Sequence, residues 1–526
     1  MPASVTISRL SYTGPDGQSL FSNLDLSFGP GRTGLVGRNG VGKTTLFRLI
    51  TGELAPATGT VAVTGRIRVL RQQVQPGPHE TIADLFGARE GLALLQRAAT
   101  GAATADEIAD ADWTLDARLD EALEALDLDV SPDTLLATLS GGQRTRAALA
   151  ALLFEAPDLI LLDEPTNNLD ADGRLAVADM LAKWRGAAIV VSHDRTLLEG
   201  MDAIVELTGL GATSYGGNWS FYRERKALEL TAAHHDLDVA ERQLREQALA
   251  AQEARERQDR RDAGGRRKAA RGDIPKIILG GMKRRAEETS AGLDRLAERQ
   301  GMAAEAQARE ARAKIEVLAP FAVKLAPTGL HAGKVVLRAA ELCGGHDAEH
   351  PVIRNLSLDI VGPERVAITG PNGVGKTTLL KLLTGQLAPL SGQVHLGGTM
   401  ALLDQQVALL DRSQTIVDNF RRLNPESSVN DCRAVLAAFM FRNDAALQVV
   451  GTLSGGEMLR AGLACVLGGA KPPMLLVLDE PTNHLDIGAI EVVEAGLRAF
   501  DGALLVVSHD RAFLEAIEVE REVMLA

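Results

Sequence analysis

The sequence has few cysteines and no long apolar run. Its three cysteines, Cys343, Cys432 and Cys465, form neither a C-x-x-C pair nor an even framework, which excludes a disulfide scaffold and a structural zinc site. No stretch reaches the roughly 18 apolar residues that a membrane-spanning helix needs. The N-terminus also has no basic segment followed by an apolar one. We therefore expect a cytoplasmic protein that does not insert into a membrane.

Length and composition bound the number of domains. Hydrophobic residues make up 45% of the chain and charged residues 24%, which is typical of soluble globular proteins. Because a single core stops growing at roughly 250–300 residues, a chain of 526 residues should divide into two or three domains. The formal net charge is −13, so the basic segment near the middle of the chain stands out.

Four short motifs occur twice, in the same order. GRNGVGKTT, TLSGGQ, LLDEPTNNLD and VVSHDR return as GPNGVGKTT, TLSGGE, VLDEPTNHLD and VVSHDR. Such a repeat indicates one domain design used twice. We place the copies at residues 1–222 and 321–526. Residues 223–320 between them are rich in Ala, Arg, Glu, Gln and Leu and are predicted to be a helical linker.

Each copy contains a complete P-loop, G-x-x-x-x-G-K-T. The glycines let backbone N–H groups surround the β-phosphate, the lysine neutralises β- and γ-oxygens, and the threonine hydroxyl binds Mg²⁺. Each P-loop follows a strand-like apolar run and opens a helix-like segment. We therefore assign nucleotide binding to Gly37, Asn39, Gly40, Gly42, Lys43, Thr44, Thr45, Gly370, Asn372, Gly373, Gly375, Lys376, Thr377 and Thr378.

An Asp-Glu pair ends a short apolar run in each copy. Such runs are typical of buried parallel strands, whose carboxyl ends face the ligand crevice of an α/β fold. We expect Asp163 and Asp479 to bind Mg²⁺ through its water shell. Glu164 and Glu480 are then placed to orient and polarise an attacking water.

The motifs LSGGQ and LSGGE resemble the signature motif of ATP-binding cassette ATPases. In that superfamily a helix N-terminus binds the γ-phosphate of ATP held by the opposite cassette, which suits its N–H donors and dipole. The resemblance implies two sandwiched sites, one joining residues 37–45 to 454–457 and the other joining 370–378 to 140–143. The signature residues are Ser140, Gly141, Gly142, Gln143, Ser454, Gly455, Gly456 and Glu457.

The same resemblance implies further roles around each phosphate. Gln72 and Gln405 match the Q-loop glutamine, which touches metal and water, and His193 and His509 match the switch histidine near the γ-phosphate. Tyr12 is the candidate for the aromatic ring that stacks on adenine. In the second copy we take Cys343 to stand at the position of Tyr12.

EPTNNLD, EPTNHLD, two cassettes in one chain and a charged linker together resemble the ABC-F family, whose members act on ribosomes. The resemblance implies an α/β fold with two P-loop cassettes, each a mixed sheet with a helical subdomain, joined by a long antiparallel helical hairpin. It also implies a monomeric ATPase that binds ribosomes in the ATP-closed state, as a housekeeping or an antibiotic-protection factor. Two alternatives stay open: a fused ATPase subunit of an ABC transporter, and a nucleotide-gated ABC protein acting on DNA.

The linker is predicted to be two helices joined at a basic tip, residues 263–285, where glycines interrupt the helical composition. Between residues 260 and 285 ten Lys/Arg stand against two Asp/Glu, a local net charge of +8. Arms of about 35 residues would place the tip roughly 50 Å away. Leu230, Leu237 and Leu244 recur every seven residues, as in a seam for the second arm.

A basic tip suits contacts to RNA phosphate, which give affinity without sequence specificity. The candidates for contact with rRNA or tRNA are Arg266, Arg267, Lys268, Arg271, Lys276, Lys283, Arg284 and Arg285. The apolar Ile277, Ile278 and Leu279 could pack on nucleotides or hold the two helices together. The first copy also has a longer acidic segment between Gln72 and Ser140, which we interpret as a helical insertion.

Overall fold

The computed structural model describes residues 3–14, 17, 19–70, 77, 79–167, 169–270, 302, 323, 325–345, 347, 349–483 and 485–525. The chain divides into two compact units, one formed by Met1–Phe221 with Phe321–Ala526 and the other by Tyr222–Pro320. Within the described residues, no helix combines the length and the apolar character needed to cross a bilayer.

The first cassette is built on two sheets. The larger has the order β5-β6-β7-β3-β8-β9 and is parallel except for the β8–β9 pair. The smaller is antiparallel, with the order β2-β1-β4. The strands are β1 (Ser4–Thr13), β2 (Ser19–Phe28), β3 (Arg32–Val36), β4 (Thr58–Thr64), β5 (Ile67–Leu70), β6 (Leu159–Asp163), β7 (Ala187–Val191), β8 (Ala203–Thr208) and β9 (Gly211–Gly216).

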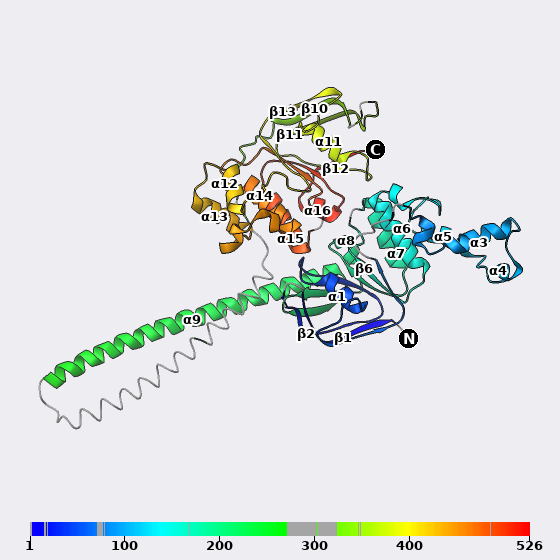
Figure 1. Ribbon diagram of the computed structural model, residues 1–526. Helices are drawn as coiled ribbons and strands as arrows, with labels where there is room; N and C mark the ends of the chain where they lie inside the picture. The colour runs from blue at the N-terminus through cyan, green and yellow to red at the C-terminus, as the bar shows by residue number, and fades with distance from the viewer. Residues whose placement is uncertain are drawn as a thin grey trace. The chain divides into compact units, whose positions relative to one another are not determined.

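The second cassette repeats this plan (Figure 1). Its larger sheet, β14-β15-β16-β12-β17, is parallel throughout, and its smaller sheet, β11-β10-β13, is antiparallel. The strands are β10 (Val335–Gly344), β11 (Ile353–Val361), β12 (Arg365–Thr369), β13 (Ser391–Leu396), β14 (Met400–Leu403), β15 (Leu475–Asp479), β16 (Ala503–Val507) and β17 (Arg521–Met524). Each cassette thus mixes parallel and antiparallel strands, which confirms the predicted fold class.

The central strands explain why both sheets form here. Every residue of β6, β7, β15 and β16 is buried. Parallel strands covered on both faces require such unbroken apolar sequences. Both strands that we predicted before an Asp-Glu pair are confirmed, and the acidic residues follow at their carboxyl ends.

Helices pack around these sheets and begin at the motifs. In the first cassette they are α1 (Lys43–Ile50), α6 (Gly141–Phe154), α7 (Ala171–Lys183) and α8 (Arg195–Glu199). In the second they are α11 (Lys376–Leu383), α14 (Gly455–Leu467), α15 (Ile487–Ala499) and α16 (Arg511–Ala516). The P-loops and the LSGG motifs therefore open helices, as the sequence predicts.

A helical segment lies between β5 and α6. It comprises α2 (Ile82–Leu85), α3 (Arg89–Ala99), α4 (Ala105–Ala109), α5 (Leu115–Glu124) and the short η1 (Leu136–Thr138). The shorter counterpart in the second cassette comprises α12 (Ile416–Leu423), α13 (Val429–Ala438), η2 (Asn443–Leu447) and η3 (Val450–Thr452). The predicted helical insertion is confirmed. Neither α3 nor α4 has a buried residue, so this part of the insertion lies at the surface.

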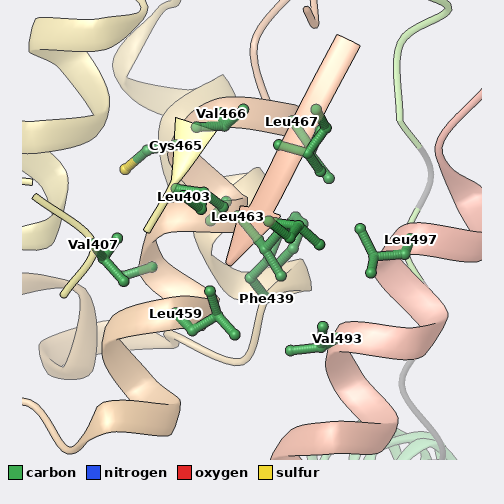
Figure 2. Packing of buried hydrophobic residues seen from close by; sticks show 14 of the residues in the cluster. Leu403, Val407, Phe439, Leu459, Leu463, Cys465, Val466, Leu467, Val493 and Leu497 are labelled. Atoms are coloured by element: carbon green, nitrogen blue, oxygen red, sulfur yellow. The ribbon is translucent and has the colours of Figure 1, made fainter. Parts of the chain in front are cut away.

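The core of the second cassette joins the helical segment to the sheet. Leu463 on α14 and Val493 and Leu497 on α15 point into one cluster with Phe439 (Figure 2). Gly462 faces β14 in the same cluster, where an added Cβ would lie 2.7 Å from a methyl group of Val407. This close approach fixes the chain that leaves β14 against α14.

The linker begins with one long helix, α9 (Trp219–Ala270). Its 52 residues correspond to roughly 78 Å, more than the arm that we predicted. Gly264 and Gly265 lie inside it, so the prediction that the helix is interrupted there was wrong. The surrounding Arg, Ala, Lys and Gln are strong helix formers, and each glycine costs only about 1 kcal/mol relative to alanine.

Two leucines of the predicted seam have described side chains on α9. Leu230 and Leu237 are half-buried, and Ala233 and Ala240 between and after them are buried. The spacing of three and four residues is that of a helix-packing face. The second predicted arm and most of the tip lie outside the described residues, as do the basic residues Arg271, Lys276, Lys283, Arg284 and Arg285. Arg266, Arg267 and Lys268 lie near the end of α9.

Candidate functional site

The two P-loops have the same local geometry. Gly42 and Gly375 stand immediately before α1 and α11 with φ of 106° and 105°, a conformation that residues with a Cβ rarely adopt. Lys43 Nζ donates to the carbonyls of Gly37 (2.7 Å) and Arg38 (3.2 Å). Lys376 Nζ makes the same bonds to Gly370 (2.9 Å) and Pro371 (3.0 Å). Each lysine is thus held inside its own loop.

Both lysines are buried, with 8% of their surface exposed. Burial lowers the pKa of each ammonium group, and the charges of nearby carboxylates oppose this shift. A buried cation at the start of a helix is a charge arrangement that favours an anion.

A threonine and an aspartate oxygen meet beside each P-loop. Thr44 Oγ1 donates to Asp163 Oδ2 at 2.8 Å, and Thr377 Oγ1 donates to Asp479 Oδ2 at 3.1 Å. Burial raises the pKa of both aspartates, while the threonine bond opposes the shift. Hard oxygen donors of this kind fit Mg²⁺, which takes few protein ligands beside substrate phosphates. Among the described residues no cluster of three or more His, Cys, Asp or Glu is arranged as a metal site by itself.

The glutamates that follow β6 and β15 turn sharply out of their strands. Glu164 and Glu480 have φ of 52° and 47°, a left-handed conformation that costs a non-glycine residue about 1–3 kcal/mol. Their backbone N–H groups donate to Val191 and Val507 at 2.9 Å, which continues the sheet bonding by one residue. The strand end therefore fixes each carboxylate while its side chain leaves the sheet.

Each glutamate faces the histidine that follows the neighbouring strand, β7 or β16. His193 Nε2 lies 3.2 Å from Glu164 Oε1, and His509 Nε2 lies 3.4 Å from Glu480 Oε1. These pairs are not aligned for hydrogen bonds: Glu164 Oε1 and both histidine Nε2 atoms are buried without a hydrogen-bond partner in the described chain. Buried polar atoms without partners are rare in proteins, so these atoms suit a ligand that brings a water molecule or a phosphate oxygen to this place.

Burial controls the charge of these groups. It raises the pKa of Glu480 to about 7, against the charges of Lys376 and Arg174, and raises that of Glu164 to about 8, against Lys43. It lowers the pKa of His509 to about 4 and that of His193 to about 3. Both histidines are therefore neutral at physiological pH.

The signature helices begin with matched caps. Ser140 accepts a hydrogen bond from the Gln143 N–H at 3.2 Å, and Gln143 Oε1 accepts one from the Ser140 N–H at 3.0 Å. Ser454 and Glu457 form the same capping box on α14. This arrangement satisfies the N–H groups of the cap and third positions. The capping box does not include the N–H groups of the two intervening glycines.

The structure brings the second P-loop and the first signature motif together. A cavity of about 450 Å³ has Ser140, Gly141 and Gly142 on one side. Its remaining lining residues are Leu169, Asn372, Gly373, Gly375, Lys376, Thr377, Thr378, Gln405, Asp479, Glu480, Asn483, Val507 and His509. The volume and the polar lining suit a nucleotide triphosphate.

Two aspartates that the sequence analysis gave no role connect the cassettes. Asp486 Oδ2 accepts a hydrogen bond from the Asn39 N–H at 2.8 Å, and Asp170 Oδ2 accepts one from the Asn372 N–H at 3.2 Å. The other oxygen of each aspartate caps its own helix, α15 or α7. Each P-loop is thus tied to the last residue of the EPTN-x-LD motif of the other cassette. The repeat of that motif was the only signal in the sequence.

An ion pair also joins the cassettes. Arg195 Nη1 lies 2.6 Å from Glu494 Oε1, and a second bond of 3.3 Å makes the pair bidentate. The side chains are 11% and 5% exposed. No pattern in the sequence pointed to this pair. Arg195 ends a VVSHDR motif, whereas Glu494 lies outside the four repeated motifs.

The remaining predicted residues are placed as follows. Gln72 lies outside the described residues. Tyr12 is half-buried and packs on the core of its cassette. Cys343 does not correspond to Tyr12: it pairs with Ser391 as Ser11 pairs with Thr58, and Gly344 takes the position of Tyr12. Our alignment of the two copies was one residue out.

Comparisons with known proteins agree with this arrangement. The family described as ABC transporter matches residues 21–167 and 353–483. Tylosin resistance ATP-binding protein TlrC of Streptomyces fradiae is 34% identical over 534 residues, covering 94% of this chain and 93% of that protein. Energy-dependent translational throttle protein EttA of Mycobacterium tuberculosis (strain ATCC 25618 / H37Rv) is 33% identical over 531 residues, covering 94% and 87%.

Among solved structures, RNase-L Inhibitor has a similar fold. Its TM-score is 0.61 at 19% sequence identity, and the match covers 99% of this chain and 87% of that chain. At this identity the likeness concerns the fold of the paired cassettes.

Proposed function

Because the chain belongs to the ABC-F family of ATP-binding cassette ATPases, we propose that it is a translation factor that binds the ribosome when ATP closes its cassettes. The protein is an ATPase, and its family members TlrC and EttA are named for tylosin resistance and for a translational throttle. We place its action in the cytoplasm, where ribosomes lie. It acts as a monomer, since one chain carries both halves of each site.

The observation that carries the proposal is the reciprocal connection between cassettes. The Asn39 and Asn372 N–H groups reach Asp486 and Asp170 of the opposite cassette. A nucleotide bound to either P-loop would therefore contact both cassettes. ATP binding then favours the closed arrangement by its higher affinity for it.

Hydrolysis follows from residues around the β6 and β15 strand ends. In their carboxylate forms Glu164 and Glu480 orient the attacking water and take its proton, while neutral His193 and His509 donate toward the γ-phosphate. The buried lysines and the N–H groups of the P-loops stabilise the charge that develops on the phosphoryl oxygens. Thr44 with Asp163, and Thr377 with Asp479, would hold Mg²⁺, which would neutralise phosphate charge when bound. Gln72 and Gln405 complete these two sites as the Q-loop residues.

Recognition of RNA is assigned to the linker. The local charge of +8 within a chain of −13 would bind phosphate, and salt screens the acidic cassettes over about 8–10 Å. We propose that Arg266, Arg267, Lys268 and the basic residues that follow contact rRNA or the ribosome-bound tRNA.

The test uses Glu164→Gln combined with Glu480→Gln, which should bind ATP without hydrolysing it. This variant is expected to co-sediment with purified ribosomes in ATP and not in ADP. Wild-type protein should co-sediment with ribosomes to a smaller extent, because it hydrolyses ATP and then dissociates from them. Duplex DNA and membranes carrying transporter subunits serve as the comparison partners. Preference for either of those over ribosomes, or no ribosome association by both proteins, would remove the translation proposal.

A further inference from the structure

The loop of residues 404–414, between β14 and α12, carries Gln405 and is strained close to it. Gln405 lines the cavity on the second P-loop. Val407, two residues later, has φ of 49°, a left-handed conformation that a β-branched residue rarely adopts. The Val407 side chain is 4% exposed and belongs to the apolar core. Such strain persists only where the surrounding structure holds the residue in place, so this Gln405 loop needs anchors.

Two side chains of α12 anchor the far end of the Gln405 loop. Asn419 Oδ1 accepts a hydrogen bond from the Asp411 N–H at 2.8 Å, and Asn419 Nδ2 donates to the Asp411 carbonyl at 2.9 Å. Arg422 Nη2 donates to the carbonyl of Leu409 at 2.7 Å and to Asn419 Oδ1 at 2.8 Å. The Asn419 side chain is fully buried. Asn419 and Arg422, here called the α12 pair, thus bind three backbone groups of the loop.

Short-range bonds connect this anchor to Gln405. The Leu410 N–H donates to the Val407 carbonyl at 3.0 Å, and the Val407 N–H donates to the Asp404 carbonyl at 3.0 Å. Asp404 Oδ1 also accepts a bond from the Ala408 N–H at 2.8 Å. Gln405 lies inside the turn that Asp404 closes. The position of Gln405 therefore depends on a turn that is bonded at both of its ends.

The first cassette does not have the side chains of the α12 pair. Thr81 and Thr415 cap α2 and α12 in the same way, each accepting a bond from the N–H three residues later, which aligns the two helices. The residues of the first copy that then correspond to the α12 pair are Leu85 and Ala88. Neither leucine nor alanine has a side-chain hydrogen-bonding group. The first copy therefore cannot form the same anchor.

We propose that Asn419 and Arg422 are positioning residues for Gln405, and that the ATP site of the second P-loop depends on them whereas the other site does not. They act by holding the strained turn of the Gln405 loop. A group that is positioned in advance need not reorganise during the reaction, and a misplacement of about 1 Å can cost about 10²-fold in rate. The pair matters only if Gln405 has the role given in the proposed function, on which this inference rests.

The experiment measures ATP turnover of purified protein without ribosomes, in a Glu164→Gln background that leaves only the second P-loop site active. Arg422→Ala should lower kcat about tenfold and change KM less than about twofold, because the P-loop still binds ATP. Arg422→Lys should recover part of kcat, since its ammonium group can still donate to the Leu409 carbonyl. Arg421→Ala is the matched control: Arg421 is the preceding residue of α12 and is exposed like Arg422. This control should leave kcat unchanged.

A double-mutant cycle separates positioning from a general loss of stability. Gln405→Ala should lower kcat at least as much as Arg422→Ala, and the two changes together should lower it no further than Gln405→Ala alone. In a Glu480→Gln background, where only the first P-loop site is active, Arg422→Ala should leave kcat within about twofold. Asn419→Leu, which introduces the residue of the first cassette, should give the same pattern. Urea unfolding checks that each variant is folded.

Three results would overturn the inference: unchanged kcat in Arg422→Ala, a loss that adds to that of Gln405→Ala, and a loss of equal size at the first P-loop site. The last two would indicate that α12 has only a structural role. If the Glu164→Gln protein hydrolyses no ATP, the same cycle is run in wild-type protein, where additivity decides. Unchanged turnover in Gln405→Ala would also remove the proposed role of Gln405. Because ribosomes are absent, all these results leave the translation proposal to its own co-sedimentation test.

Discussion

Single residues at the strand ends combine backbone strain with the side chains proposed for catalysis. Glu164 and Glu480 adopt left-handed backbone conformations that ordinary residues avoid. The same turn lets their N–H groups bond to the neighbouring strand while the carboxylates face His193 and His509. Backbone strain is thus located at the two residues whose carboxylates face the histidines.

The three cysteines should differ sharply in reactivity. The Asn355 N–H donates to Cys343 Sγ at 3.1 Å and lowers the pKa of that thiol, which is half-buried. Burial raises the pKa of Cys432, and raises that of Cys465 to about 12. Since the thiolate is the reactive form, the rate of labelling should rise with pH earlier at Cys343 than at a free cysteine.

The measurement is alkylation of native protein followed by peptide mapping. We expect label at Cys343 alone before denaturation and at all three cysteines after it. Cys343→Ser should remove the native label. Native labelling of Cys465 at neutral pH would contradict the packing of α14.

Residue identities could be predicted where a motif fixes them. The P-loop and Asp-Glu residues were predicted from their order and their place after apolar runs, because phosphate binding demands particular residue types in one local order, and the LSGG residues were predicted from their resemblance to a known signature motif. Asn419, Arg195 and Glu494 could not be found this way. Their partners lie on other elements or in the other cassette, and no periodicity in the chain records such pairing.

At the scale of elements, the residues at the start of α7 and α15 both cap their helix and bind the P-loop of the other cassette. Asp170 and Asp486 use one oxygen to cap a helix and the other to hold the opposite P-loop. The signature serines cap α6 and α14 in the same region. Stability of these helices and assembly of the sites are therefore linked through the same atoms.

Ser140→Ala tests whether the α6 cap has a role beyond stability. Loss of a serine cap costs about 1 kcal/mol, to be measured by urea unfolding. Ser428→Ala is the matched control, because Ser428 caps α13 in the same type of capping box. Both changes should lower stability alike, whereas only Ser140→Ala should reduce ATP turnover. Equal effects on turnover would mean that the cap is only structural.

Element boundaries were predicted well in the cassettes and poorly in the linker. Where a motif directly follows an apolar run, the end of the strand can be placed within a residue or so, as in β6 and β15. In α9, by contrast, Gly264 and Gly265 suggested a break that the helix does not make. A long run of strong helix formers outweighs two glycines, and local composition alone does not reveal that balance.

At the scale of the whole molecule, the Arg195–Glu494 pair should strengthen the closed state. Both side chains are largely buried, and removing one partner leaves an uncompensated charge that costs about 3–5 kcal/mol. Either Arg195→Ala or Glu494→Ala should therefore raise the ATP concentration at half-saturation, and the double variant should recover part of the loss. Nucleotide titration in the Glu164→Gln, Glu480→Gln background measures this.

Arg511→Ala is the control for that cycle. Arg511 is the residue of the second copy that corresponds to Arg195, and it is exposed. The residue of the first copy that corresponds to Glu494 is Ala178, so Arg511 would face an alanine in place of a glutamate. Its removal should leave ATP binding nearly unchanged. Additive effects of Arg195→Ala and Glu494→Ala would show that the two side chains do not act as a pair.

The linker should determine how salt affects ribosome binding. Replacing Arg266, Arg267, Lys268, Lys283, Arg284 and Arg285 with glutamine removes charges that would displace counterions from RNA. The slope of log affinity against log salt concentration should become shallower by roughly 0.7–0.9 for each RNA phosphate that the variant no longer neutralises. An unchanged slope would exclude phosphate binding by these residues. ATP turnover of the free variant serves as its folding control.

The central claim is that ATP holds the protein on the ribosome and that hydrolysis releases it. The direct measurement is the rate at which labelled protein leaves purified ribosomes in ATP after unlabelled protein is added. Wild-type protein should leave at its own rate of ATP turnover, and the Glu164→Gln, Glu480→Gln protein should remain at least about tenfold longer. Equal dissociation rates for the two proteins would contradict the account.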